Sequence, residues 1–178
     1  IAYGIFGATT TVLGGVAASK AFALGAAVYN SVAFGIAPLY GIAMQGIEFE
    51  QGKNPFFVML DGVTDVRNFG AIARTCECAA VDAVIIPARG SASVNADAVK
   101  TSAGALHTLP VCREQNLRAT LQYLKDSGFR IVAATEKGDY DYTKADYTGP
   151  LCIIMGAEDT GVSYDNLALC DCLLYTSP

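Results

Sequence analysis

The chain has 178 residues and a mass of 18.6 kDa, which suits one domain with an appendage. Hydrophobic residues make up 52% of it, enough for a sizeable core. The formal net charge of -5 and the pI of about 4.7 disfavour nucleic-acid binding through overall charge, because such binding depends on neutralising phosphates. Any contact with RNA must therefore come from a local site.

Residues 1–47 differ from the rest of the chain, since Lys20 is their only charged residue and Gly and Ala dominate. Each half approaches the ~20 residues that a helix needs to cross a bilayer. Gly and Ala insert weakly, however, and Pro38 interrupts the second run. Three interpretations stay open: a membrane hairpin, a packed helical segment of a soluble protein, or sequence not native to this domain. Residues 48–55 are polar and are interpreted as a linker.

From residue 56 onward, apolar runs of strand length alternate with helical patterns. Strands are expected at 56–61, 83–87, 108–113, 130–135, 151–155 and 172–175. Helices are expected at 69–80, 95–102, from 116 to a Gly at 128, and at 163–170, with a polar loop or short helix at 137–148. This order predicts an α/β fold with a mostly parallel sheet and helices on both faces.

Two polar loops follow predicted strands, one at 62–68 and one at 156–163. Ligands of parallel sheets bind beyond the carboxyl ends of the strands, so we expect the two loops to lie side by side. The first loop carries Asn68, and Arg74 follows nearly two helical turns later. A guanidinium and an amide suit an oxyanion, a phosphate or a ribose hydroxyl. Spacing alone nevertheless favours an ordinary surface cation for Arg74.

Several other kinds of site are disfavoured. The second loop, GAEDTGVS, has Walker-like glycine spacing, but Val162 occupies the position of the essential lysine. Neither C-x-C pair has the spacing of common zinc sites, so the six cysteines are interpreted as reduced thiols of a cytoplasmic protein without a metal. Pairs of carboxylates such as Asp61 and Asp65, or Asp139 and Asp141, lack the spacing of a metal loop and are interpreted as solvated surface.

The motifs also resemble a known family. The stretch LDGVTDVRNFGAIARTCECAAVDAVIIP is similar to the first motif of the SpoU (TrmH) family of RNA ribose 2′-O-methyltransferases. Residues 100–117, KTSAGALHTLPVCREQNL, resemble the region that follows it, and IIMGAEDTGVS resembles the second motif. The similarity runs in order from about residue 55 to about residue 171. It is greatest to the members that methylate a guanosine ribose of 23S rRNA.

The resemblance implies an α/β-knot fold of the SPOUT superfamily, S-adenosylmethionine as cofactor, RNA as partner and a homodimer. By this likeness, Arg74, Asn68 and Glu158 are the candidate catalytic residues. Thr135, Gly156 and Glu158 would contact the cofactor. Arg67, Asn68 and Arg74 would contact RNA.

The chain departs from the family pattern at both ends. The third motif, which contains Ser-Leu-Asn and threads the knot, is not found, because the chain reads CDCLLYTSP at its place. Residues 56–178 are therefore expected to form a methyltransferase domain with an incomplete knot. The alternative function is a truncated, inactive remnant that binds RNA or cofactor, with membrane attachment open only through residues 1–47.

Overall fold

The computed structural model describes residues 54–175. The segment 1–47 lies outside this part of the chain, and so does the expected linker apart from Asn54 and Pro55. Within 54–175, no helix is long and apolar enough to cross a membrane. The three interpretations of residues 1–47 therefore stay as they were.

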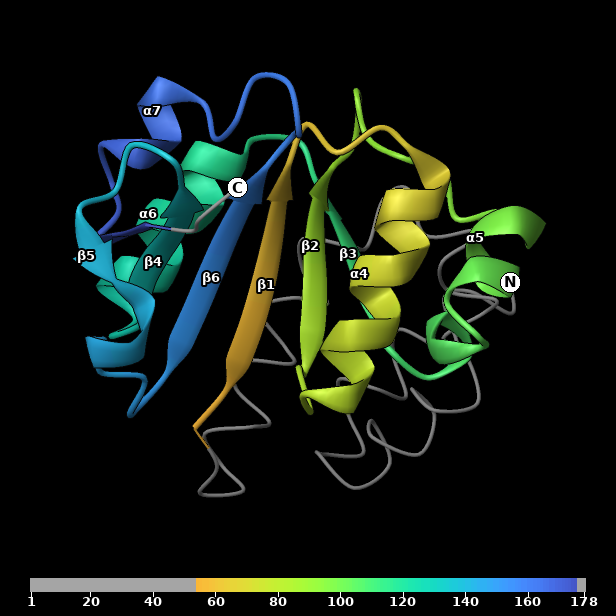
Figure 1. Ribbon diagram of the computed structural model, residues 1–178, viewed down its shortest axis with the longest axis horizontal. Coiled ribbons are helices and arrows are strands. Elements are labelled where there is room, and N and C mark those ends of the chain that lie inside the picture. Colours follow the sequence, from red (N-terminus) through yellow and green to blue (C-terminus); the bar gives the residue numbers. More distant parts are fainter. Residues whose placement is uncertain (1–53, 176–178) are drawn as a thin grey trace, which may run out of the picture.

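A seven-stranded sheet forms the centre of the molecule (Figure 1). Its spatial order is β3-β2-β1-β6-β4-β7-β5, and each neighbouring pair of strands is parallel. The strands are β1 (Phe56–Asp61), β2 (Ala83–Pro87), β3 (Val111–Glu114), β4 (Arg130–Thr135), β5 (Tyr140–Asp141), β6 (Leu151–Gly156) and β7 (Cys172–Tyr175). The predicted parallel α/β sheet is thus confirmed.

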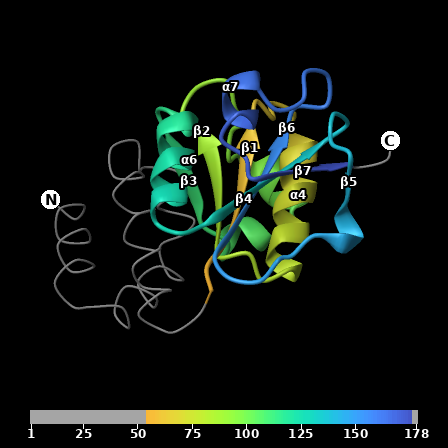
Figure 2. The same ribbon diagram turned by 90° about the vertical axis from the view of Figure 1, so that its left-hand side faces the viewer.

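Helices cover both faces of the sheet, as the two views show together (Figures 1 and 2). One face carries α4 and α5, and the other carries α6 and α7. The helices are α4 (Val66–Cys78), α5 (Ala96–Thr101), α6 (Leu117–Asp126) and α7 (Tyr164–Leu167), with 3-10 turns at Ala105–His107 and Tyr142–Lys144.

The alternation of side chains along β1 accounts for this two-sided burial. Phe57 and Met59 point into the cluster that contains α6, whereas Val58 and Leu60 point into the cluster that contains α4. Successive residues of a strand face opposite sides of a sheet, so an uninterrupted apolar run is stable only when both sides are covered. All four side chains are at most 5% exposed.

The chain changes direction between β1 and β6, the two central strands. From β1 it continues through α4 to β2 on one side, and from β6 it continues through α7 to β7 on the other. Asp61 pairs with Gly156 in the register of these strands. Such a switch point leaves room for a ligand beyond the strand ends, and both predicted loops begin there.

Some expected boundaries are wrong. The helix expected at 69–80 is α4, which begins at Val66 because the Asp65 side chain caps its first turn. The last helix ends at Leu167 and not near residue 170, and the strand expected from residue 108 begins at Val111. The polar segment 137–148 contributes the short strand β5. The expectation of an incomplete knot concerns the chain after Tyr175, outside the described residues.

Candidate active site at the carboxyl ends of β1 and β6

The first motif places its polar residues on a helix rather than in a loop. The Asp65 carboxylate accepts a hydrogen bond from the Asn68 main-chain N–H at 2.7 Å, as an N-cap residue does. Arg67 and Asn68 therefore lie in the first turn of α4, which corrects their expected place in a loop. Both side chains are exposed at the edge where β1 ends.

The second loop folds back tightly on itself. Ala157 and Gly161 form an antiparallel bridge, and the Ala157 N–H donates to the Asp61 carbonyl at 3.0 Å. A Cβ at Gly156 would overlap the main chain of Gly161 and Val162. Glycine is therefore required at position 156 by this close approach of two backbones.

Asp61 joins the two motifs, although its carboxylate was expected to be solvated surface. Its Oδ2 accepts hydrogen bonds from Ser163 N and from Asn166 Nδ2, each at 2.9 Å. Asn166 lies on α7 and is 5% exposed. The expectation was wrong because these donors lie 102 and 105 residues further along the chain, where no local pattern shows them.

Asn68 and Glu158 meet across the switch point. Asn68 Nδ2 donates to Glu158 Oε2 at 3.3 Å, although the residues are 90 positions apart. Both side chains are exposed, so solvent or a ligand can reach the pair. The structure thus brings one residue from each motif together, as expected for adjacent loops.

Arg74 lies further along α4, away from this contact. At 100° per residue, six residues place it about 120° around the helix from Asn68 and about 9 Å along the axis. Arg74 instead lies on the same side of α4 as Arg67, which precedes it by seven residues. Both arginines are exposed. Neither guanidinium makes a hydrogen bond or an ion pair with another residue in the range 54–175, so both are available to a ligand.

Thr135 occupies the end of β4, next to β6. It is 4% exposed, and its hydroxyl accepts a hydrogen bond from the Lys137 main-chain N–H at 3.2 Å. The Glu136 carboxylate reaches the second loop, where a Cβ on Gly161 would lie 3.7 Å from one of its oxygens. The turns after β4 and β6 are therefore in contact, and Glu136 is a residue that the sequence did not single out.

The polar groups at this edge of the sheet suit an organic or polyanionic ligand. Among the residues 54–175, no group of three or more His, Cys, Asp and Glu is arranged to hold a metal ion. An amide and a carboxylate meet here, and the guanidiniums of Arg67 and Arg74 lie on a different side of α4.

Comparison with known proteins decides the family. The model of the SpoU rRNA Methylase family matches residues 55–176. The chain belongs to the SpoU rRNA methylase family. The matched range begins one residue before β1 and includes both motifs, so the SpoU domain coincides with the described sheet.

Two relatives of this SpoU chain are named for the same activity. The 23S rRNA (guanosine-2′-O-)-methyltransferase RlmB of Photorhabdus laumondii is 39% identical over 124 residues, which cover 70% of this chain and 51% of that protein. The enzyme of the same name from Escherichia coli K12 is 38% identical over 120 residues, covering 67% and 49%. The chain spans about half the length of these relatives.

Solved structures of SpoU proteins share the fold. A TrmH/SpoU tRNA modifying enzyme from A. aeolicus has a TM-score of 0.62 and 26% identity, covering 71% of this chain and 64% of that one. The SpoU methyltransferase AviRb from Streptomyces viridochromogenes, in complex with AdoMet, has a TM-score of 0.64 over 71% of this chain and 50% of that one. At 24% identity, the second likeness concerns the fold alone.

Proposed function

We propose that this chain forms the catalytic core of an S-adenosylmethionine-dependent RNA ribose 2′-O-methyltransferase, with a guanosine of 23S rRNA as substrate. The contact between Asn68 and Glu158 carries the proposal, because it joins the two family motifs at the switch point. Relatives named for guanosine-2′-O methylation of 23S rRNA support the substrate. The inactive remnant is the disfavoured alternative, since both motifs are in place.

The residues at the ends of β4 and β6 fit the proposed cofactor. Gly156 allows two backbones to approach closely, and Thr135 places a buried hydroxyl beside the contacting turns. Main-chain groups, a hydroxyl and the nearby Glu136 carboxylate can hold a ligand that has both an amino acid and a nucleoside part. Thr135, Gly156 and Glu158 would thus contact S-adenosylmethionine.

The chemistry requires little beyond orientation and charge. S-adenosylmethionine, when bound, supplies a methyl group on a positively charged sulfur. The ribose 2′-oxygen would displace this sulfur directly, so that a C–O bond would form, the C–S bond would break and the hydroxyl proton would pass to solvent. Asn68 and Glu158 would orient the ribose, since positioning supplies much of the rate in such a displacement. Arg74 would stabilise the developing alkoxide, because an arginine hardly gives up its own proton.

RNA would meet the protein at Arg67, Asn68 and Arg74, which are exposed on α4. The main chain of Arg74 lies about 9 Å along the helix axis from that of Asn68. A homodimer, which the family likeness implies, is part of the proposal, and it offers a way for a second chain to bring its own charged groups to the site. The cytoplasm is the matching compartment.

A methyl-transfer assay tests the function. The chain is incubated with radiolabelled S-adenosylmethionine and unmodified 23S rRNA transcript, and ribose methylation is mapped by primer extension at low nucleotide concentration. We expect a single modified guanosine ribose. Label on a base, or no incorporation by a folded chain that binds the cofactor in calorimetry, would contradict the proposal.

The role of Arg74 is tested by Arg74→Lys. The side chain is exposed, so the fold should be unaffected. Lysine keeps the charge but lacks the planar fork, so we expect kcat to fall about tenfold or more while KM changes little. Retention of full methyl transfer with an unchanged pH dependence would rule out the proposed stabilisation of the alkoxide.

A further inference from the structure

The charges of the described chain are divided unevenly over the sheet. Residues 54–113, which form β1, β2, α4 and α5, carry five carboxylates and five cations. Residues 114–175, which form most of the rest, carry ten carboxylates and five cations. Seven of these ten carboxylates lie on or beside α6, α7, β4, β5 and β7, which are called the acidic half below. Glu114 ends β3, and Glu158 and Asp159 lie in the second loop.

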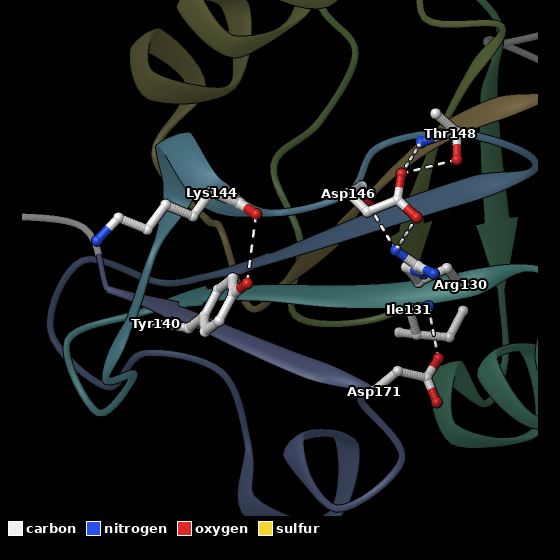
Figure 3. A network of polar contacts seen from close by, with 7 residues as sticks. All are labelled: Arg130, Ile131, Tyr140, Lys144, Asp146, Thr148 and Asp171. Carbon is white, nitrogen blue, oxygen red and sulfur yellow. Dashed lines mark hydrogen bonds and ion pairs between the residues drawn. The ribbon is translucent and has the colours of Figure 1, made fainter.

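In the acidic half, cations are held by carboxylates. Four ion pairs lie there, and Figure 3 shows one of them, between Arg130 and Asp146 at 2.9 Å. The other three are Lys125–Asp171 at 2.7 Å, Arg118–Asp165 at 3.6 Å and Lys144–Asp141 at 3.8 Å. Four of the five cations of residues 114–175 thus lie within 3.8 Å of a carboxylate oxygen, and Lys137 is the exception among these described residues.

Among residues 54–113, three of the five carboxylates accept hydrogen bonds from N–H groups, and no ion pair is found between described residues. Asp61 accepts from Ser163 and Asn166, Asp65 accepts from the Asn68 main chain, and Asp82 accepts from the Phe56 main chain at 2.8 Å. Three arginines in this half make no hydrogen bond or ion pair with other described residues: Arg67, Arg74 and Arg89. An exposed cation without a carboxylate partner is free to bind a phosphate.

Arg89 brings this charge close to the proposed active site. It lies in the loop after β2, which rises above the sheet near the start of α4 in Figure 1. The loop is bonded to the first motif, because the Ala92 N–H donates to the Val63 carbonyl at 2.8 Å. Arg113 braces the loop from β3, with Nη1 at 3.3 Å from Ser91 Oγ and Nη2 at 3.4 Å from the Ala92 carbonyl.

We propose that RNA lies across the half of the sheet edge formed by α4 and the loop 88–93, with Arg89 contacting an RNA phosphate and the β5–β7 edge remaining free of RNA. The inference rests on the proposed function for its class of ligand. It adds Arg89 as a contact and states which part of the surface the RNA covers. Phosphates are attracted to the arginine-bearing half and repelled by the carboxylates of the other.

Salt-dependent RNA binding by the whole chain tests this placement. The dissociation constant for a fluorescein-labelled RNA stem-loop is measured between 50 and 200 mM salt, a range chosen for the strength of the counterion effect there. We expect Arg89→Ala to weaken binding about fivefold at the low-salt end and to lower the slope of log K against log salt by about 0.7 to 0.9. Arg89→Lys should restore the slope and most of the affinity, because lysine binds phosphate as a point charge and the slope depends on the charge that is neutralised.

Lys144→Ala is the matched control. It removes one positive charge from an exposed position in the acidic half, so the change in net charge is the same. Affinity and slope should stay as in the unsubstituted chain. Equal losses for Arg89→Ala and Lys144→Ala, no loss for Arg89→Ala, or no RNA binding even at low salt would each overturn the proposed path.

The outcome is separable from that of the methyl-transfer assay. Binding with the expected pattern but without methylation would contradict the proposed function and leave the RNA path standing. Methylation with identical RNA affinities for the Arg89 and Lys144 variants would do the reverse.

Discussion

Asp61, at the end of β1, holds Asn166 of α7 through a hydrogen bond of 2.9 Å, and the same carboxylate oxygen accepts from Ser163 N. The second loop lies between these partners and the end of β6, so its position depends on a residue of the first motif. Glu158, which reaches Asn68, is part of that loop. The geometry of the site therefore depends on one half-buried carboxylate that does not itself lie in the contact.

Asp61→Ala should lower the free energy of unfolding by about 3 kcal/mol, because two donors lose their acceptor and one of them is buried. Urea denaturation followed by circular dichroism measures the change. Asp159→Ala is the control, since Asp159 is exposed in the same loop, and should stay within about 0.5 kcal/mol. Equal losses in the two variants would show that the Asp61 hydrogen bonds do not stabilise the fold.

Gly156→Ala should be costly for a different reason. The added methyl group would overlap the backbone at Gly161, so either β6 or the loop must move, at a cost of about 3 kcal/mol. Gly149→Ala is the comparison: its φ of +81° strains an alanine by about 1–2 kcal/mol, but its surroundings are open. Thermal or urea denaturation should show that the Gly156→Ala variant is considerably less stable than the Gly149→Ala variant. The reverse order would contradict the close approach.

Asp171 should make stability depend on pH. Burial raises its pKa, but the hydrogen bond from the Ile131 N–H at 2.9 Å and the ammonium of Lys125 at 2.7 Å outweigh burial, so the pKa lies below its ordinary value. Figure 3 shows the contact with Ile131. A carboxylate with a lowered pKa stabilises the fold above its unfolded pKa, and this stabilisation is lost as pH falls through the folded pKa.

Asp171→Asn should therefore cost about 1 kcal/mol near pH 7 and almost nothing at a pH low enough to protonate the carboxyl group in both the folded and the unfolded chain. Urea denaturation at the two pH values measures this. Asp165→Asn should have little effect at either pH, because its side chain is 78% exposed and its partner Arg118 is 3.6 Å away. A cost for Asp171→Asn that is the same at both pH values would exclude the ionic contribution.

The cysteines should differ widely in reactivity. Burial raises the pKa of the Cys76 thiol to about 11, and burial together with the nearby Glu114 raises that of Cys112 to about 12, whereas Cys78 is exposed. Iodoacetamide at pH 8 should alkylate Cys78 first, because the thiolate is the reactive form and must be accessible. Peptide mass mapping measures the rates, with urea-unfolded chain as control. Rapid alkylation of Cys112 in the folded chain would contradict its burial.

Local patterns predicted the elements better than their arrangement. The run Ala83–Pro87 is apolar and β-branched, and it is a strand at the expected residues. The start of α4 was placed three residues late, because the apolar periodicity begins at Phe69 while the helix begins at its cap, Asp65. Asp65 is the residue of the sequence that indicates the true start of this helix, because a carboxylate at that position can cap the first turn.

The interior of the site could not be read in the same way. Motif likeness singled out Asn68 and Glu158, and the structure brings them together. The role of Asp61 depends on donors more than 100 residues away, and its sequence neighbours are equally consistent with solvated surface. The position of β6 between β1 and β4 likewise depends on contacts between distant residues, which no short stretch of sequence reveals.

The strand order also determines when the site can form during synthesis and folding. β6 is made after β1 and β4, yet it must enter between them, so contacts across many residues have to form late. A nascent chain that has completed only β1 to β4 has Asn68 but neither Gly156 nor Glu158. Insertion of β6 therefore brings Gly156 and Glu158 to the end of β1, and an unfinished chain cannot form the contact between Asn68 and Glu158 on which the site depends.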